Sequence, residues 1–131
     1  MNSLSLGELN DVQRSAVITN ASKVLVLAGA GSGKTRVLVH RIAWLIQQQT
    51  LPSQIFAATF TNKAASEMRL RVEKMLAQDL KKMWLGTFHG LAHRLLLLHW
   101  CEAQLPQTFQ ILDADDQYRL LRRIYKNLRI D

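Results

Sequence analysis

Residues 23–35 read KVLVLAGAGSGKT, and this stretch decides the fold class. Its first part, Lys23–Ala28, is a short and almost continuously apolar run, which predicts a strand buried on both faces. A glycine-rich turn comes next, and a helix is expected from about Gly33 to Gln49. A strand, a glycine-rich loop and a helix in this order are typical of a loop that binds phosphate.

The segment Ala28–Thr35, called the phosphate loop below, has the Walker A spacing with alanine in place of the usual first glycine. Its glycines let the backbone adopt conformations closed to other residues and come close to a phosphate group. Lys34 would carry positive charge to the β- and γ-phosphates, and the Thr35 hydroxyl would bind Mg²⁺, which makes these two the catalytic positions. The strand–loop–helix context disfavours an accidental glycine turn. The expected nucleotide-binding residues are Ala28, Gly29, Ala30, Gly31, Ser32, Gly33, Lys34 and Thr35.

The chain alternates strands and helices as far as residue 103. We expect a second strand at Ile55–Phe60, a helix at about 62–77, a third strand at Met83–Thr87 and a leucine-rich helix at about 90–103. Strands separated by helices of this length pair in parallel, through right-handed crossovers. The predicted fold class is therefore α/β.

One more helix is expected at Asp113–Leu128. An apolar face is predicted to point inward, while the opposite face carries Arg119, Arg122, Arg123, Lys126 and Arg129. The apolar run that ends at Asp113 also resembles a Walker B strand, but Gln110 interrupts it and alanine follows the acid. A helix cap at Asp113 is the favoured interpretation. The chain stops without a helix-stop signal, which predicts a piece of a longer protein.

Composition narrows the class further. The 131 residues fit one domain, and the net charge of +7 suggests an anionic partner, with phosphate the first candidate. No apolar run is long enough to cross a bilayer, and the first twenty residues lack a secretory pattern, so no membrane partner is expected. The single cysteine, Cys101, fits a reducing cytosol, so a cytoplasmic location is expected.

Five collinear blocks resemble successive motifs of the UvrD/Rep/PcrA family of superfamily-one DNA helicases. They are LNDVQRSAV at 9–17, the phosphate loop and its helix to Ile46, TFTNKAASEMRLRV at 59–72, GTFHGLAHRLL at 86–96 and FQILDADDQYRLL at 109–121. The resemblance covers nearly the whole chain. It implies a P-loop NTPase fold, a RecA-like parallel sheet with flanking helices. Residues 1–90 would form the N-terminal part of the ATP-binding motor domain, and residues 91–131 the beginning of an inserted helical subdomain.

The resemblance also implies a function. The parent would be an ATP-dependent 3′→5′ DNA helicase and translocase in DNA repair, with ATP and Mg²⁺ as cofactors. Its partners would be single-stranded DNA, junctions of single- and double-stranded DNA, and repair proteins. The acidic pair that activates water and the second motor domain would lie beyond residue 131, so the chain alone is expected to be inactive. The alternatives are the helicase part of a helicase–nuclease and a non-catalytic module that binds nucleotide or single-stranded DNA.

Two further nucleotide-site residues follow from the resemblance. Gln13 matches a glutamine that reads the adenine edge, for which an amide is suited because it both donates and accepts hydrogen bonds. From spacing alone, Gln13 fits equally well in a capping box with Asn10. Arg36 matches a residue beside the base and ribose, and without the resemblance it would be a solvated helix arginine.

The resemblance assigns DNA-binding roles to Phe60, Thr61, Asn62, Thr87 and His89. These residues follow predicted parallel strands, at the edge of an α/β sheet where ligands bind. Phe60 would form part of a base-binding pocket, although a lone phenylalanine is more often a core residue. Thr61 and Asn62 could bind phosphate or cap the next helix, and the pattern alone favours the cap.

The spacing of two histidines suggests a possible zinc site. His89 and His93 are four residues apart, which suggests zinc together with Cys101 or His99. However, no glutamate stands in an HExxH position, and no second ligand pair has a known spacing. Zinc is therefore disfavoured, and His93 is expected to pack against its neighbours or to face solvent.

Overall fold

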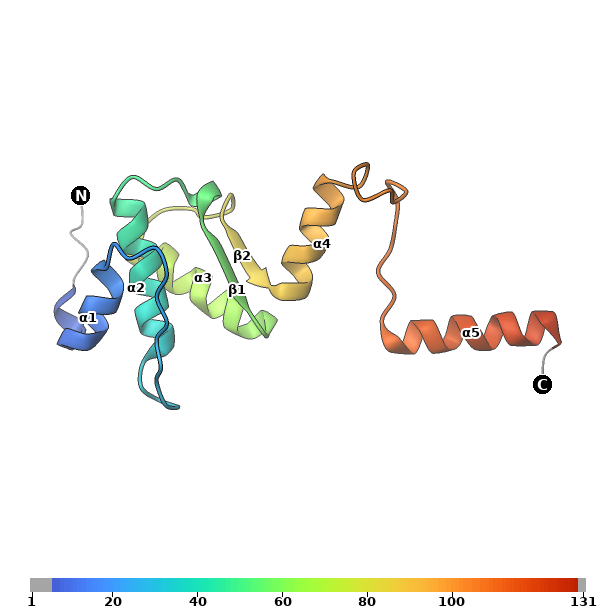
Figure 1. The fold of residues 1–131 in the computed structure, drawn as a ribbon, viewed down its shortest axis with the longest axis horizontal. Coiled ribbons are helices and arrows are strands. Elements are labelled where there is room, and N and C mark those ends of the chain that lie inside the picture. Colours follow the sequence, from blue (N-terminus) through green and yellow to red (C-terminus); the bar gives the residue numbers. More distant parts are fainter. Residues whose placement is uncertain (1–5, 130–131) are drawn as a thin grey trace. The chain divides into compact units, whose positions relative to one another are not determined.

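The structure is a computed structural model that describes residues 6–129 (Figure 1). Its elements are η1 (Leu6–Glu8), α1 (Asp11–Ile18), α2 (Lys34–Gln47), η2 (Pro52–Gln54), β1 (Phe56–Thr59), α3 (Asn62–Leu76), β2 (Trp84–Thr87), α4 (Phe88–Leu98) and α5 (Ala114–Leu128). The chain forms two compact units that divide between Leu91 and Ala92. The predicted mixed α/β class is confirmed. None of the helices in residues 6–129 is long and apolar enough to cross a membrane.

The sheet of the first unit consists of β1 and β2, which pair in parallel. Phe56 is opposite Trp84, and Thr59 is opposite Thr87. The crossover between the strands contains α3, as a parallel pair requires. The two later predicted strands are therefore confirmed, each with slightly narrower bounds, and their carboxyl ends lie next to each other.

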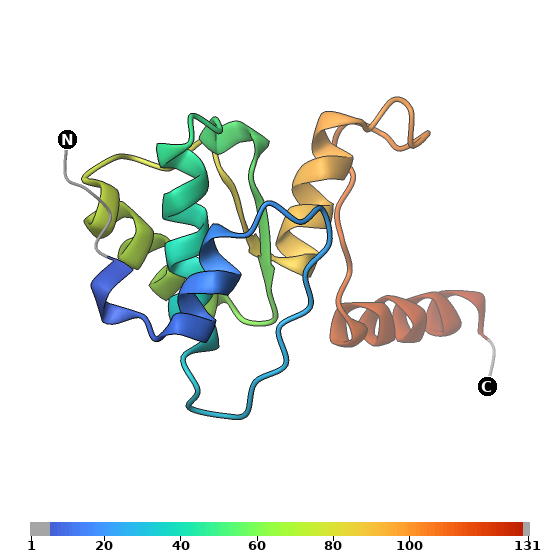
Figure 2. The same cartoon turned by 60° about the vertical axis from the view of Figure 1, so that its left-hand side comes forward.

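The first predicted strand is wrong for this chain. Residues 23–28 form no regular secondary structure, and the segment between α1 and α2 is a long loop (Figure 2). Leu25 and Leu27 are more than four-fifths exposed. A strand buried on both faces needs hydrogen-bonded neighbours. Within residues 6–129 the sheet consists of β1 and β2, and residues 23–28 pair with neither of them, so this apolar run is irregular.

The main core lies between α2, α3 and one face of the sheet. It contains Val39, Ile42, Ile55, Ala65, Met68, Val72, Leu80, Met83 and Leu85, all buried. Arg69 of α3 ties this layer together, since its guanidinium donates hydrogen bonds of 2.9 Å to the backbone oxygens of Leu80 and Leu85. These bonds hold α3 against β2 and the loop that leads into it.

A second cluster joins α1 to α2. Leu9, Val17 and Val37 are buried together, and Arg41 of α2 donates hydrogen bonds to the carbonyl oxygens of Val17 and Thr19. The last carbonyls of a helix have no partner within the helix, so Arg41 satisfies two oxygens at the end of α1. This link fixes α1 beside the start of α2, where the phosphate loop ends.

The later helices differ from their predicted bounds for local reasons. Helix α4 begins at Phe88 rather than residue 90, because the Thr87 hydroxyl accepts a hydrogen bond from the Gly90 N–H. It ends at Leu98 rather than residue 103, and the turns that follow include Gln104 with a positive φ of 54°. The cap at Asp113 is confirmed, since its carboxylate accepts from the Asp116 N–H at 2.8 Å.

The apolar face of α5 is not turned inward as predicted. Its large apolar side chains are all exposed: Tyr118, Leu120, Leu121, Ile124, Tyr125 and Leu128. Within residues 92–129, the described part of the unit that contains α5, no segment covers this face. The sequence pattern therefore predicts which residues form the apolar face of α5, but it does not predict whether that face is buried.

The core can be tested with two leucines. Leu80 is fully buried and Leu70 is about half exposed. We expect Leu80→Ala to lower the free energy of unfolding by about 2–5 kcal/mol, because it removes buried methyl groups and leaves a cavity. The same substitution at Leu70 removes much less buried surface and should cost under about 1 kcal/mol. Urea unfolding followed by circular dichroism measures both values, and equal losses would contradict this core.

Candidate functional site

Two of the three glycines in the phosphate loop adopt the backbone conformation that favours glycine. Gly31 and Gly33 have φ values of 74° and 85°, a region that other residues rarely adopt. Gly29 has no positive φ, and an added Cβ there would meet nothing within 4 Å. The expectation that all three glycines need special conformations is thus wrong for Gly29. Helix α2 begins at Lys34, so the last two residues of the loop form its N-terminus, where backbone amides are free to bind an anion.

A cavity of about 420 Å³ lies over the end of the loop. Its lining combines α1, the loop, α2 and α3, and consists of Gln13, Gly31, Ser32, Gly33, Lys34, Thr35, Arg36 and Arg71. Seven of these eight are sequence-predicted residues, whereas Ala28, Gly29 and Ala30 lie outside the lining. The cavity has three cationic side chains and no acidic one, which suits an anionic ligand.

Lys34 holds the phosphate loop together. Its ammonium group donates to the carbonyl oxygens of Ala28 and Gly29, at 2.8 and 2.6 Å. An ammonium has three donor hydrogens, so one remains for a phosphate oxygen even with both bonds in place. Thr35 is exposed in the first turn of α2 and lines the same cavity, so its hydroxyl is available to a metal ion.

Gln13 connects α1 to the phosphate loop. Its side-chain oxygen accepts from the Asn10 N–H at 3.1 Å, and its own backbone N–H donates to the Asn10 side-chain oxygen at 2.8 Å, so the predicted capping box is present. Its amide nitrogen donates to the Ser32 carbonyl at 3.0 Å. A primary amide has two N–H donors, so a second donor remains for a ligand. The capping box and a role beside a base are therefore compatible.

Two arginines border the cavity from different helices. Arg36 lies in the first turn of α2, and its guanidinium donates to the Glu8 carbonyl at 3.4 Å. Arg71 comes from α3, where Glu67 is 3.8 Å away as a weak, exposed ion pair. Sequence reasoning missed Arg71, because only the packing of α3 against α2 brings it to the loop. No local pattern signals that proximity.

Two phenylalanines meet where β1 and β2 end. Phe60 is 90% exposed and Phe88 is 52% exposed, and their ring centroids are 5.3 Å apart. With His89 they form what we call the aromatic edge. The core interpretation of Phe60 is wrong, because a side chain so exposed contributes almost nothing to the core. Phe88 was not predicted, although it lies between two residues that were.

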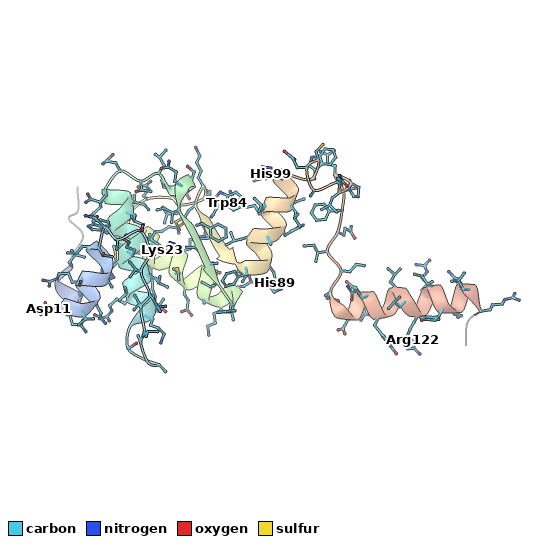
Figure 3. The ribbon with its side chains drawn as sticks, viewed as in Figure 1. Asp11, Lys23, Trp84, His89, His99 and Arg122 are labelled. Carbon is cyan, nitrogen blue, oxygen red and sulfur yellow. The ribbon has the colours of Figure 1, made fainter. Side chains whose placement is uncertain are left out.

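The other residues predicted to bind DNA at this edge lie where helices α3 and α4 begin. The Thr61 hydroxyl accepts from the Ala64 N–H at 3.2 Å, so the predicted cap of α3 is confirmed at Thr61. Asn62 is the first residue of α3 and is exposed. Thr87 ends β2 and His89 lies exposed in the first turn of α4 (Figure 3). The register of the sheet thus gathers all five predicted residues at one edge.

No metal cluster is found in the described part of the chain. Residues 6–129 contain no group of three or more histidine, cysteine or acidic side chains arranged to hold a metal ion. His93 is half-buried and meets the ring of Phe109 edge-on, with centroids 5.6 Å apart. Of the two roles expected for His93, packing against neighbours and facing solvent, the structure shows the packing role.

Known proteins are similar to this chain over nearly its whole length. Residues 9–131 match the family model described as the UvrD/REP helicase N-terminal domain. DNA helicase II of Salmonella typhimurium is 59% identical over 127 residues, which is 96% of this chain and 18% of that protein. DNA helicase II of Escherichia coli has the same identity and coverage. ATP-dependent DNA helicase PcrA of Staphylococcus aureus is 42% identical over 132 residues. The chain thus spans about a fifth of the length of these relatives, 18% in each case.

The loop geometry predicts unequal effects at two glycines. We expect Gly33→Ala to lower the free energy of unfolding by about 1–3 kcal/mol, because alanine is strained at a positive φ. The new Cβ would also lie 2.9 Å from the Gln13 amide nitrogen, which breaks the link to α1. Gly29→Ala is the matched control and should change stability by less than about 0.5 kcal/mol. Urea unfolding of both variants decides, and equal stabilities would contradict the loop described here.

Proposed function

The chain belongs to the UvrD/REP helicase family, in which it matches the N-terminal domain, and we propose that it is the ATP-binding N-terminal segment of an ATP-dependent 3′→5′ DNA helicase in DNA repair. The observation that carries this proposal is the cationic cavity over the phosphate loop, in a unit that also carries an exposed aromatic edge. The direction of movement along DNA and the role in DNA repair are inferred from the resemblance to the family.

ATP would bind at the phosphate loop of a P-loop NTPase fold with a RecA-like sheet. Backbone amides of Gly31–Thr35 and the dipole of α2 would hold the phosphates, and Lys34 would neutralise the β- and γ-phosphates. Thr35 would bind Mg²⁺, which supplies further positive charge to the phosphate groups. Gln13 and Arg36 would contact the base and ribose. Arg71 lines the same cavity and would contact the nucleotide from α3.

Single-stranded DNA would cross the aromatic edge. Two exposed rings suit unstacked bases of any sequence, because every base has a π-face. The exposed Asn62 and His89 would add hydrogen bonds to phosphate or base, with the first turns of α3 and α4 favouring anions. Thr61 and Thr87 would support this site by fixing the two helix starts.

Residues 1–90 would form part of the motor domain, with residues 91–131 the start of an inserted helical subdomain. The acids that activate water would be supplied by the remainder of the protein, since Asp113 is engaged as a helix cap. The 131-residue chain by itself would bind nucleotide without hydrolysing it.

The proposed function predicts that ATP hydrolysis and DNA binding can be lost separately. In the complete gene product, we expect Lys34→Ala to lower the ATPase rate by about a hundredfold or more, because this substitution removes a charge that stabilises the transferring phosphoryl group. Affinity for single-stranded DNA should change less than twofold. Lys82→Ala, at an exposed lysine in the turn before β2, is the control. Steady-state phosphate release and fluorescence anisotropy measure the two properties, and parallel losses of both by folded enzyme would refute the separation.

A further prediction of the proposed function concerns the aromatic edge. We expect Phe60→Ala to weaken binding of single-stranded oligonucleotides by about 1–3 kcal/mol, similarly for different sequences, because it removes one stacking surface. Phe56→Ala is the control, since Phe56 is also exposed but lies at the other end of β1 against Trp84. Anisotropy titrations of both variants decide. Equal affinities for the two variants would exclude Phe60 from the DNA site.

A further inference from the structure

Both strands of the sheet end in a threonine that is followed by a phenylalanine. Thr59 ends β1 and precedes Phe60, and Thr87 ends β2 and precedes Phe88. The register pairs Thr59 with Thr87, so the two phenylalanines leave the sheet from equivalent positions on neighbouring strands (Figure 1). The position of one ring relative to the other therefore depends on how each strand end is held.

The Thr59 side chain connects the end of β1 to the start of α3. Thr59 is half-buried, and its hydroxyl donates to the Thr61 carbonyl oxygen at 3.0 Å. That carbonyl also accepts from the Ala65 N–H at 3.1 Å, in the first turn of α3. The Thr61 hydroxyl accepts from the Ala64 N–H at 3.2 Å. The residues on either side of Phe60 are thus linked to each other and to α3.

The Thr59 hydroxyl also lies close to the second strand. Its oxygen is 3.5 Å from the Gly86 carbonyl oxygen, which is longer than an ordinary O–H···O hydrogen bond. A hydroxyl has one hydrogen, so it donates to Thr61 in the shorter bond and only touches Gly86. Thr59 therefore contacts both strand ends that lead into the aromatic edge.

Phe60 lies at the surface, where the core does not hold its ring. Its side chain is 90% exposed, and the ring meets Phe88, which is itself 52% exposed. A ring that must be ordered when a base arrives binds less tightly, because ordering costs conformational entropy. A hydrogen bond that spans Phe60 lowers this cost, since it orders the backbone before DNA binds.

We propose that Thr59 is a positioning residue of the DNA site, which acts through Phe60 and does not itself touch DNA. Its hydrogen bond to Thr61 holds the backbone turn from which the Phe60 ring projects. The inference rests on the proposed function, because it requires Phe60 to bind single-stranded DNA. Loss of the hydroxyl would leave the ring present but less ordered, so affinity for every single-stranded sequence would fall by a similar factor.

Thr59→Val in the complete gene product tests this role, because valine keeps the branched side chain suited to a strand and replaces the hydroxyl by a methyl group. We expect affinity for single-stranded oligonucleotides to fall by about three- to tenfold, the effect of losing one hydrogen bond. Thr59→Ser keeps the hydroxyl and should stay within about twofold. The DNA concentration that gives half-maximal ATPase should rise by the same factor as the dissociation constant, while the maximal rate changes less than about twofold.

A double-mutant cycle with Phe60 separates this positioning role from a purely structural one. If Thr59 acts through Phe60, Thr59→Val should weaken DNA binding by less than about 1.5-fold once Phe60→Ala is present. Anisotropy titrations measure the affinities of the cycle. Independent losses at the two positions would overturn the proposal, and so would an unchanged affinity in Thr59→Val or a serine variant as weak as the valine variant.

Thr19→Val is the matched control, and it should leave DNA affinity unchanged. Thr19 is also half-buried, and its hydroxyl accepts from the Ala21 N–H at 3.2 Å, but it lies after α1 and outside the aromatic edge. An equal loss of affinity in this control would overturn the proposal. Circular dichroism checks folding, and Thr59→Ala removes the same hydroxyl if the valine variant does not fold. Phe60→Ala without effect on DNA affinity would contradict the proposed DNA site, and the positioning role with it.

Discussion

The parallel pairing of β1 with β2 is the constraint on which the rest of the structure depends. Because paired parallel strands end together, Thr59 and Thr87 are neighbours, and the residues after them emerge at one edge. This is why Phe60 and Phe88 meet although they are distant in the chain. Residues 23–28 join neither strand of this sheet and have no regular secondary structure.

The phosphate loop is held in place without a strand, because the residues that lead into it do not belong to the sheet. Lys34 bonds back to the loop carbonyls, and Gln13 ties Ser32 to the first helix. The loop is thus held by side chains that are also the ones suited to contact a nucleotide. Each retains a spare donor, so a ligand would add bonds before it had to break any. Arg41 supports this arrangement by fastening α1 to α2.

The sequence by itself determined the helices and the two later strands, the glycine-rich turn of the phosphate loop, the helix caps at Asn10 and Asp113 and the two faces of α5. These features depend on neighbouring residues, through turn conformation, side-chain capping or helical periodicity. Only the tertiary structure decided that residues 23–28 are not a strand, that Arg71 borders the loop cavity and that Phe60 is exposed. Strand formation, burial and proximity depend on which distant segments supply partners, and that information is spread over the whole chain.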